Sequence, residues 1–238
     1  RSRARAERNF HEAASRFADR IEGAPIKRVN VLNALANAYI RHTLQSEAKE
    51  VLDQSVNETG KLKEELPRIK LMTEIAELYA KNGMPREERR LLDAALKQSD
   101  SFSRDVDRMQ GKVMVCNALA NSGRIDEALE IVDNVDHALK EYGLGAVAVA
   151  VSKRGDFRFA RELLDRIRLQ RPKMDAMINV ASTLVDAGGT EESWKILADV
   201  EAIIKGHDVA TTVAFNKARM AEIYARTGKT ARADKTLS

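Results

Sequence analysis

The sequence is short of the residues that turn a chain. Its 238 residues include only 12 Gly and 4 Pro, about 7% of the chain where about 12% is usual. This scarcity argues against a β-sandwich, a β-barrel or a disordered tail. Aromatic residues are also few, at 5%. A core must therefore be built from Ala, Leu, Ile and Val, a mixture typical of helices packed closely on helices.

Cysteine and long apolar runs are nearly absent. The single Cys116 excludes an internal disulfide framework and fits a reducing compartment, so we expect a cytoplasmic protein. The longest apolar stretch, Leu144–Val151, is far shorter than the roughly 20 residues that cross a bilayer. We therefore expect no membrane span.

Neither sign of charge dominates the sequence. The 40 Lys and Arg residues against 36 Asp and Glu give a net charge of +4, spread along the chain. A weak and scattered excess of this kind argues against nucleic acid as the partner. The one dense basic run is Arg1, Arg3, Arg5 and Arg8. If this run bound nucleic acid, the affinity would fall steeply with salt.

Residue patterns for catalysis are also lacking. The four His residues are far apart and have no Cys neighbours, unlike the ligands of a metal site. There is no phosphate-binding loop, dinucleotide fingerprint or Ser-centred elbow. We therefore expect no cofactor, no metal and no enzymatic activity.

What the sequence does contain is an internal repeat. Segments that end in Gly83, Gly123 and Gly228 are alike, and the shared Gly can anchor an alignment. The anchors are Thr43, Gly83, Gly123, Gly155, Gly188 and Gly228, spaced 40, 40, 32, 33 and 40 residues apart. An anchor at Gly189 would put Trp194 among small residues, so Gly188 gives the better alignment.

Five positions relative to the anchor each keep one kind of residue. Bulky or apolar residues stand eight and four residues before it and nine residues after it. Small residues stand seven before it and five after it, where Glu88 is the exception. These spacings predict a helical hairpin with one apolar stripe on each helix and a left-handed Gly at the turn. One hairpin cannot bury its stripes alone, so neighbouring hairpins must stack.

This pattern resembles the tetratricopeptide repeat family, over roughly residues 8–238. The resemblance implies an all-α fold, a right-handed α-solenoid of stacked antiparallel helical hairpins. We expect a basic arm and one helix of a partial repeat over residues 1–27, with Ala13 and Phe17 in repeated positions. Residues 28–238 would form a repeat domain of about six hairpins, the last one truncated.

The period departs from the family's usual length of about 34 residues. The extra residues fall between hairpins, around 57–68, 98–108 and 205–215, and should lengthen helices or loops there. The pentatricopeptide family is similar in sequence pattern. Its strict period matches one base per repeat, so the variation from 32 to 40 residues argues against it.

In the tetratricopeptide family the first helix of each hairpin lines a concave groove, so the resemblance implies groove positions here. The candidate partner-binding residues are Asn30, Asn33, Asn37, Lys70, Glu74, Met114, Asn117, Asn121, Val149, Asn179 and Arg219. Asn recurs among them, and an amide that both donates and accepts can pair with the backbone of an extended peptide. The alternative is that these Asn residues cap helices or face solvent.

The middle repeats supply an apolar floor to the expected groove. Its residues are Val113, Met114, Gly145, Ala146, Val149 and Ile178. An apolar floor suits a partner helix or a hydrophobic peptide, but the same residues could form core between hairpins. The family's clamp for chaperone C-termini is not reproduced, because Glu74 would repel a carboxylate and Met114 stands where a basic residue is needed.

The sequence therefore predicts a protein-binding adaptor or scaffold that holds a peptide or helix of a partner protein in its groove. Two alternatives stay open. One is a peptide-sensing regulatory domain of a larger protein, and the other is a helical repeat protein that binds nucleic acid. Terminal hairpins with uncovered apolar stripes would in addition allow homo-oligomers.

Overall fold

The computed structural model describes residues 24–135, 137–206 and 210–237, and all the regular secondary structure in these ranges is α-helix. The chain divides into two compact units, Arg1–Ala118 (unit 1) and Leu119–Ser238 (unit 2), and each is described by itself. The sequence predicts a basic run and a partial repeat over residues 1–27. Residues 1–23 of this segment lie outside the described residues.

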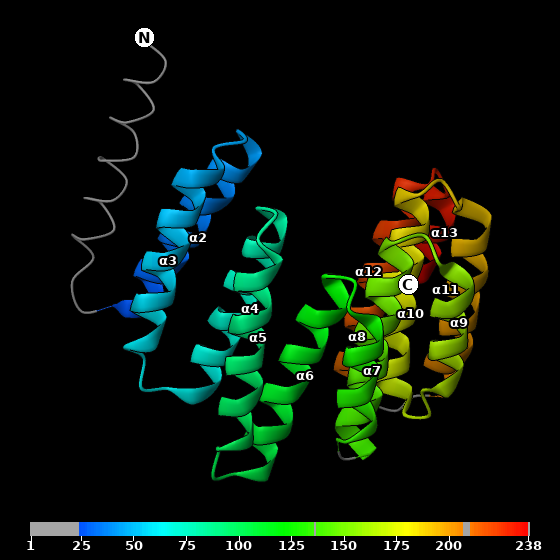
Figure 1. The fold of residues 1–238 in the computed structure, drawn as a ribbon. Helices are drawn as coiled ribbons and strands as arrows, with labels where there is room; N and C mark the ends of the chain where they lie inside the picture. Colours follow the sequence, from blue (N-terminus) through cyan, green and yellow to red (C-terminus); the bar gives the residue numbers. More distant parts are fainter. Residues whose placement is uncertain (1–23, 136, 207–209, 238) are drawn as a thin grey trace. The chain divides into compact units, whose positions relative to one another are not determined.

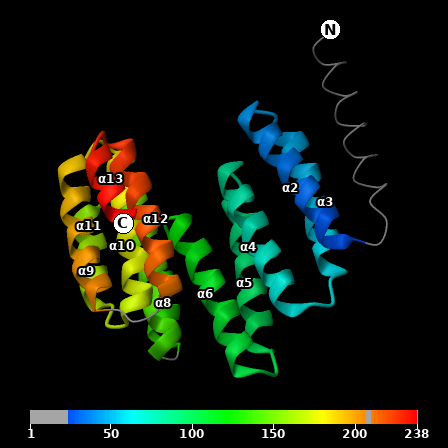
Figure 2. The ribbon, with the colours of Figure 1, turned by 180° about the vertical axis from the view of Figure 1, so that it is seen from behind.

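Twelve helices follow one another in the described ranges, first and second helices of the repeat alternating (Figures 1 and 2), and within each unit successive first and second helices pack as hairpins. The first helices are α2 (Pro25–Arg41), α4 (Glu65–Lys81), α6 (Asp105–Asn121), α8 (His137–Lys153), α10 (Gln170–Asp186) and α12 (Ala210–Arg226). The second helices are α3 (Gln45–Gly60), α5 (Pro85–Asp100), α7 (Ile125–Asp133), α9 (Phe157–Arg166), α11 (Thr190–Lys205) and α13 (Thr230–Leu237). The prediction of an all-α fold of sequential hairpins is confirmed.

The turn inside each hairpin has the conformation that the repeat predicts. Every first helix has 17 residues and ends two residues before its anchor. The five anchor glycines have φ between +74° and +87°, and Thr43 has a φ of +59°. Glycine adopts this left-handed backbone without a Cβ clash, whereas Thr43 adopts it against a steric cost.

Differences among the second helices account for the uneven spacing of the repeat. Helices α3, α5 and α11 have 16 residues, whereas α7 has 9 and α9 has 10. The long repeats therefore carry about two further helical turns. The insertions expected from the sequence mainly lengthen helices.

The repeated positions form the core of each unit. At all five positions the side chains are buried in every hairpin, apart from Leu237 near the end of α13, which is 59% exposed. Glu88 stands where the other hairpins have a small residue and is only 5% exposed. Its Oε1 atom has no hydrogen-bond partner among the described residues.

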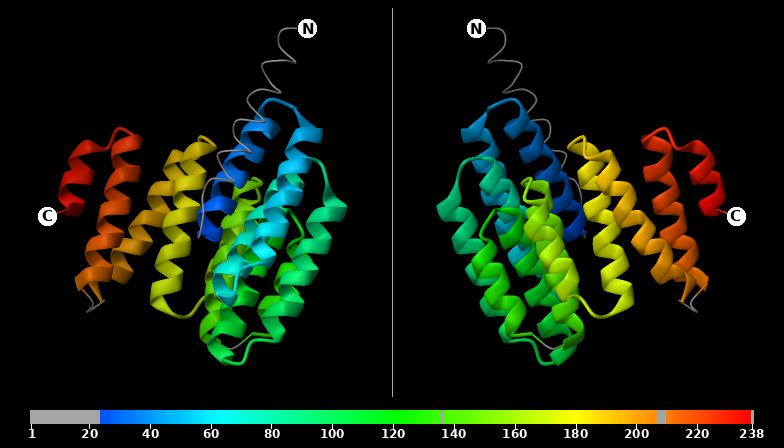
Figure 3. Two further views of the ribbon diagram at one scale, coloured as in Figure 1. Left: turned by 90° about the vertical axis from the view of Figure 1, so that its left-hand side faces the viewer. Right: turned by 90° about the vertical axis from the view of Figure 1, so that its right-hand side faces the viewer.

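Neighbouring hairpins pack along their first helices. In unit 1, α2 and α3 both pack on α4, and in unit 2, α10 packs on both α8 and α12. Figure 3 shows the last hairpin, with α12 in orange beside α13 in red. Some contacts demand glycine: a Cβ on Gly111 of α6 would lie 2.4 Å from the Oγ atom of Ser99 in α5. Close helix approach thus depends on single small residues.

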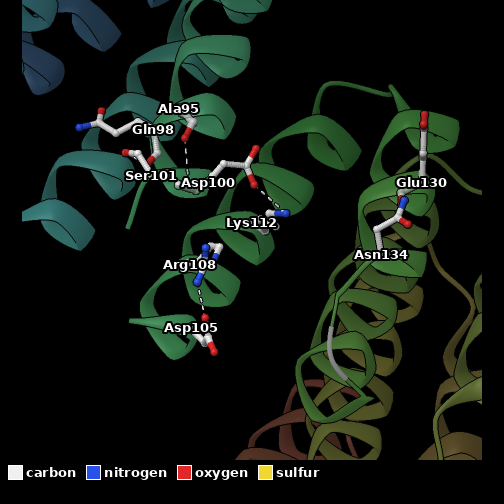
Figure 4. Close-up of polar contacts among 10 residues, drawn as sticks. Ala95, Gln98, Asp100, Ser101, Asp105, Arg108, Lys112, Glu130 and Asn134 are labelled. Atoms are coloured by element: carbon white, nitrogen blue, oxygen red, sulfur yellow. Dashed lines mark hydrogen bonds and ion pairs between the residues drawn. The ribbon is translucent and has the colours of Figure 1, made fainter. Parts of the chain in front are cut away.

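Polar contacts hold the connection between α5 and α6 in unit 1. The hydroxyl of Ser101 donates to the backbone carbonyl of Gln98 at 2.7 Å. Lys112 Nζ of α6 lies 2.7 Å from the carboxylate of Asp100 (Figure 4). The end of the long helix α5 is thereby tied to the helix that follows it.

A buried carboxylate holds the corresponding connection in unit 2. Glu141 of α8, only 3% exposed, accepts hydrogen bonds from the backbone N–H groups of Arg168 and Leu169, the second at 3.1 Å. These two residues immediately precede α10, where helical N–H groups lack intrahelical partners. Glu141 therefore serves as a cap supplied by another hairpin.

Candidate functional site

The first helices of unit 1 form a small hollow. It has a volume of about 280 Å³, between α2 and α4. Its lining residues are Asn33, Ala34, Asn37, Glu74, Glu77, Leu78 and Lys81. Because α2 packs beside α4, positions just before the two anchors meet. The structure thus brings together three of the predicted partner-binding residues, Asn33, Asn37 and Glu74.

Contacts within unit 1 distinguish the side chains of this hollow. The buried Ser55 of α3 donates to Oδ1 of Asn33 at 2.6 Å, so this amide oxygen is already bonded. Lys70 Nζ, from one turn earlier on α4, lies 3.8 Å from the carboxylate of Glu74. Among the described residues, none bonds the side-chain amide of Asn37. Asn37 is therefore the lining amide that has no side-chain bond to a described residue.

The other predicted residues before Leu119 lie outside the lining of this hollow. Asn30 is exposed on α2, Asn117 is exposed on α6, and Met114 of α6 is half-buried. Asn121 is exposed at the end of α6 and belongs to unit 2. Within unit 1, the structure does not gather Asn30, Met114 and Asn117 with the lining residues Asn33, Asn37 and Glu74.

In unit 2, the first helices α10 and α12 are joined by polar contacts. Arg219 of α12 donates to Oδ1 of Asp175 at 3.0 Å and to Oδ1 of Asn179 at 2.7 Å, both on α10. Its guanidinium carbon lies 5.4 Å from the centre of the Phe215 ring, within the range of a cation–π interaction. The predicted residues Asn179 and Arg219 therefore bond to each other.

A second rung repeats this arrangement along the same helices. Arg226 of α12 donates to the hydroxyl of Ser182 at 3.1 Å and forms an ion pair with Asp186, both on α10. We call the set Asp175, Asn179, Ser182, Asp186, Arg219 and Arg226 the unit 2 ladder. Its side chains stand at the repeat positions that the sequence assigned to a partner, and here they link two hairpins.

The apolar positions expected on the groove floor divide into core and partial surface. Ile178 is 1% exposed and Gly145 is buried, with the Cβ of Ala176 only 3.1 Å from where its own Cβ would stand. The core interpretation holds for these two. Val149 of α8 is half-buried. On the first helices of unit 2, the most exposed large apolar side chain is Phe215 of α12, at 62%, at a repeat position that the family resemblance places in the groove.

A larger hollow of about 620 Å³ lies in unit 1 between the second helices. We call it the α3–α5 trough. One wall is α3 from Lys49 to Gly60, and the other is α5 from Glu87 to Gln98. Three residues of α4 form its floor: Arg68, Met72 and Tyr79. The sequence did not predict this hollow, because the family resemblance assigns binding to positions on first helices and the hollow is walled by second helices.

Asp53 links a wall of the trough to its floor. Its carboxylate accepts a hydrogen bond from the Tyr79 hydroxyl at 2.6 Å and pairs with Lys49 at 2.6 Å. Partial burial acts to raise the pKa of Asp53, but the bonds from Lys49 and Tyr79 outweigh it and hold the pKa below its ordinary value. Burial, followed by the bond to Asp53, raises the pKa of Tyr79 well above its usual range.

One recurring feature of the sequence could have pointed to this side of the molecule. Fifteen residues before the anchor, five of the six repeats have a basic residue: Arg28, Arg68, Arg108, Lys140 and Lys173. All five are half-buried. Arg28 pairs with Glu58 at 3.1 Å, and Arg68 donates to the carbonyl of Leu62 at 3.3 Å. In these two repeats the basic residue lies against the last turn of a long second helix or the loop after it.

Three further features are the buried cysteine, the arrangement of metal-ligating side chains and the hydropathy of the helices. Cys116 is buried in α6, and burial raises the pKa of its thiol to about 12, as for a packing residue. No group of three or more His, Cys, Asp or Glu residues in the described ranges is placed to hold a metal ion. Over the same ranges, no helix is both long and apolar enough to cross a membrane.

Comparisons with known proteins add two similar structures. No family model and no curated protein matches the chain. Ton1535 from Thermococcus onnurineus NA1 is 13% identical, with a TM-score of 0.49, over 96% of this chain and 70% of that one. A variant of the nearly identical TPR-like repeats from a Podosopora anserina putative kinesin light chain is 22% identical, with a TM-score of 0.43, over 76% of this chain and 95% of that one. The paired helices, left-handed anchors and buried repeat positions described above show that the described residues form tandem helical hairpins in the register that the sequence repeat predicts.

Proposed function

We propose that this chain is a protein-binding adaptor that takes an extended peptide of its partner across the first helices of unit 1. The observation that carries the proposal is the hollow between α2 and α4, where Asn37 stands beside Glu74, Glu77 and Lys81. Stacked helical repeats generally bind partners on the extended surface of such helices.

The polar groups of the hollow indicate the kind of peptide. The Asn37 amide can donate to a peptide carbonyl and accept from a peptide N–H without reading the side chain. The lining has two carboxylates, Glu74 and Glu77, and one ammonium, Lys81, and Lys70 pairs with Glu74 from outside it. A peptide with a Lys or Arg residue at this point is favoured because it can pair with these carboxylates, and a C-terminal carboxylate is disfavoured because they would repel it.

The difference between the units supports placing the peptide on unit 1. In unit 2 the equivalent positions are engaged in the ladder, where Arg219 and Arg226 bond to residues of α10. A partner would have to displace those bonds before it could use the same groups. In unit 1, Asn37 has no such bond to a described residue.

Selection from a library of random 12-residue peptides on the full chain tests the proposal. We expect selected peptides to contain Lys or Arg, and fluorescence anisotropy to show about tenfold weaker binding to Asn37→Ala, the effect of losing one or two hydrogen bonds. Glu77→Gln should weaken binding as well. The control is Gln54→Ala, which changes an exposed residue of α3 and should leave affinity unchanged.

Asn33 is left in place in this experiment because its removal would deprive the buried Ser55 hydroxyl of an acceptor. Peptides whose affinity is the same for Asn37→Ala, Glu77→Gln and the parent chain would contradict the proposal. A selection that yields no binding peptide would contradict it too.

A further inference from the structure

The α3–α5 trough is a second surface, formed by other helices than those of the proposed function. Its walls are the 16-residue helices α3 and α5, and its floor is α4. The volume of about 620 Å³ is within the range of built ligand sites. It equals the space of roughly twenty liquid water molecules, so a sizeable group can enter.

The middle of the trough is apolar. Val56 of α3, Met72 of α4, and Leu91 and Ala94 of α5 line it there. Met72 and Val56 are half-buried and Ala94 is exposed, so these side chains are available to a partner. Contact with them would remove apolar surface from water, which favours binding.

The charges of the trough are arranged differently at its two ends. Toward the first turns of α3 and α5 it is lined by Lys49, Asp53, Glu87 and Arg90, two cations and two anions. Toward the last turns of the two helices, the one charged lining residue is Arg68. Its guanidinium donates to the amide oxygen of Gln98, and Asn57 supplies a second amide to the lining. Arg68 is therefore the group at that end with which an acidic side chain can pair, whereas the helix ends themselves favour positive charge.

The direction of the walls adds to this asymmetry. The chain reverses at each turn, so α3 and α5 run the same way and both run antiparallel to α4. The contact of Arg68 near the start of α4 with the Leu62 carbonyl just after α3 fits this arrangement. The negative ends of both wall dipoles thus lie at the Arg68 end. A guest helix antiparallel to the walls would place its positive N-terminal end there.

We propose that the α3–α5 trough binds an amphipathic helix of a partner protein, antiparallel to α3 and α5, with acidic residues in its first turn. The acidic turn lies beside Arg68, where the guest's own dipole also favours negative charge. The apolar face of the guest covers Val56, Met72 and Ala94, in the manner of helices that dock in grooves. The wall from Lys49 to Gly60 is roughly 16 Å long, so about three turns of guest helix make contact.

Two synthetic 14-residue peptides test this inference on the full chain. Both are held helical by a hydrocarbon staple on the solvent face and carry Leu at positions 4, 8 and 11, spacings of about one turn. One has Asp and Glu in its first turn and Lys in its last turn, and the other has these charges exchanged. Fluorescence anisotropy should give the acidic-first peptide a dissociation constant below about 100 µM, at least tenfold lower than that of its isomer.

Variants of the trough complete the test. Ala94→Arg fills the apolar middle and should weaken the acidic-first peptide at least tenfold, and Asn57→Asp should weaken it severalfold by adding a negative charge near Arg68. Ala202→Arg is the matched control, because Ala202 is an exposed alanine of another 16-residue second helix, α11. Far-ultraviolet circular dichroism verifies that the variants fold. Asn37→Ala should not change this affinity, which separates the inference from the proposed function.

The inference fails if neither peptide binds, if both bind equally, or if Ala94→Arg leaves binding unchanged. Self-association of the chain that Ala94→Arg abolishes, with no peptide bound, would identify a second copy as the occupant and would overturn the inference as well.

Discussion

The first helices of the two units carry different polar contacts at the same repeat positions. In unit 1, α2 and α4 leave a hollow with Asn37 unbonded by described residues, and its nearest ion pair, Lys70 with Glu74, stays within α4. In unit 2, Arg219 and Arg226 of α12 cross to α10. The buried positions are alike in both, so the core does not decide whether polar groups on a first helix bond to a neighbouring hairpin.

The second helices differ in a related way. Unit 1 has two consecutive helices of 16 residues, α3 and α5, with the trough between them. In unit 2, α7 and α9 are short, and the buried Glu141 caps the start of α10 after the shorter helix ends. The longer second helices of unit 1 thus form the walls of a hollow. After the shorter α9 of unit 2, the side chain of Glu141 holds the connection to α10.

The largest effect should come from removing the cap in unit 2. Glu141→Ala leaves two backbone N–H groups before α10 without their acceptor and should cost about 3 kcal/mol of stability. Hydrogen exchange followed by mass spectrometry should show faster exchange across α8 to α10 and unchanged exchange in α2 to α5. Glu130→Ala, at an exposed residue of α7, is the control. Equal loss of protection in both units would contradict the prediction that Glu141 stabilises unit 2 alone.

Overpacking between helices should produce the next effect, in unit 1. Gly111→Ala puts a methyl group 2.4 Å from Ser99 Oγ and 2.9 Å from Ser99 Cβ, and should destabilise by about 2 kcal/mol. Gly60→Ala, where no atom lies within 4 Å of the added Cβ, should be neutral or slightly stabilising. Thermal unfolding of the two variants measures the difference. A Gly111→Ala protein as stable as Gly60→Ala would refute the close contact.

Breaking the unit 2 ladder should have a smaller effect. Arg219→Ala removes bonds to Asp175 and Asn179 at a partly exposed site, so we expect a loss of about 1 kcal/mol. The loss should shrink in high salt, because screening weakens the pair in the parent protein. Lys70→Ala in unit 1 should change stability by less than about 0.5 kcal/mol. A double-mutant cycle of Arg219 with Asp175 measures the coupling energy between them. A coupling energy of zero would show that this pair does not stabilise unit 2.

The smallest effect concerns acid pH in unit 1. The pKa of Asp53 is lower in the folded chain than its ordinary value of 3.8. Its stabilising contribution is therefore complete above that ordinary value and is lost as the pH falls through the lower, folded pKa. Asp53→Asn should flatten the decline of stability below about pH 4, as followed by urea unfolding. Asp93→Asn, at an exposed residue of α5, is the control, and identical acid profiles for all three proteins would be the contrary result.

Much of the hairpin architecture could be predicted because it depends on local rules. A left-handed turn at Gly83 or Gly228 and an apolar stripe at fixed helical spacing are properties of short segments. They hold for Thr43 as well, which adopts the same left-handed turn without a glycine. The alignment also located the core, since even Glu88 is buried at its repeat position.

The candidate site was predictable only in part, because side-chain partners depend on neighbouring hairpins. The repeat placed Asn33, Asn179 and Arg219 at first-helix positions. It carried no information that Ser55 would bond to Asn33 or that Arg219 would bond to Asn179. Those contacts join residues 22 and 40 positions apart, beyond any local pattern.

The sequence by itself determined the number of hairpins, the positions of their turns and the residues that form the core. A period of apolar and small residues fixes these through local conformation and burial. Only the tertiary structure decided which first-helix side chains bond to a neighbouring hairpin and that a trough lies between α3 and α5. These features depend on hydrogen bonds and ion pairs between charged and amide side chains of separate hairpins. Those contacts form only where packing brings the hairpins side by side.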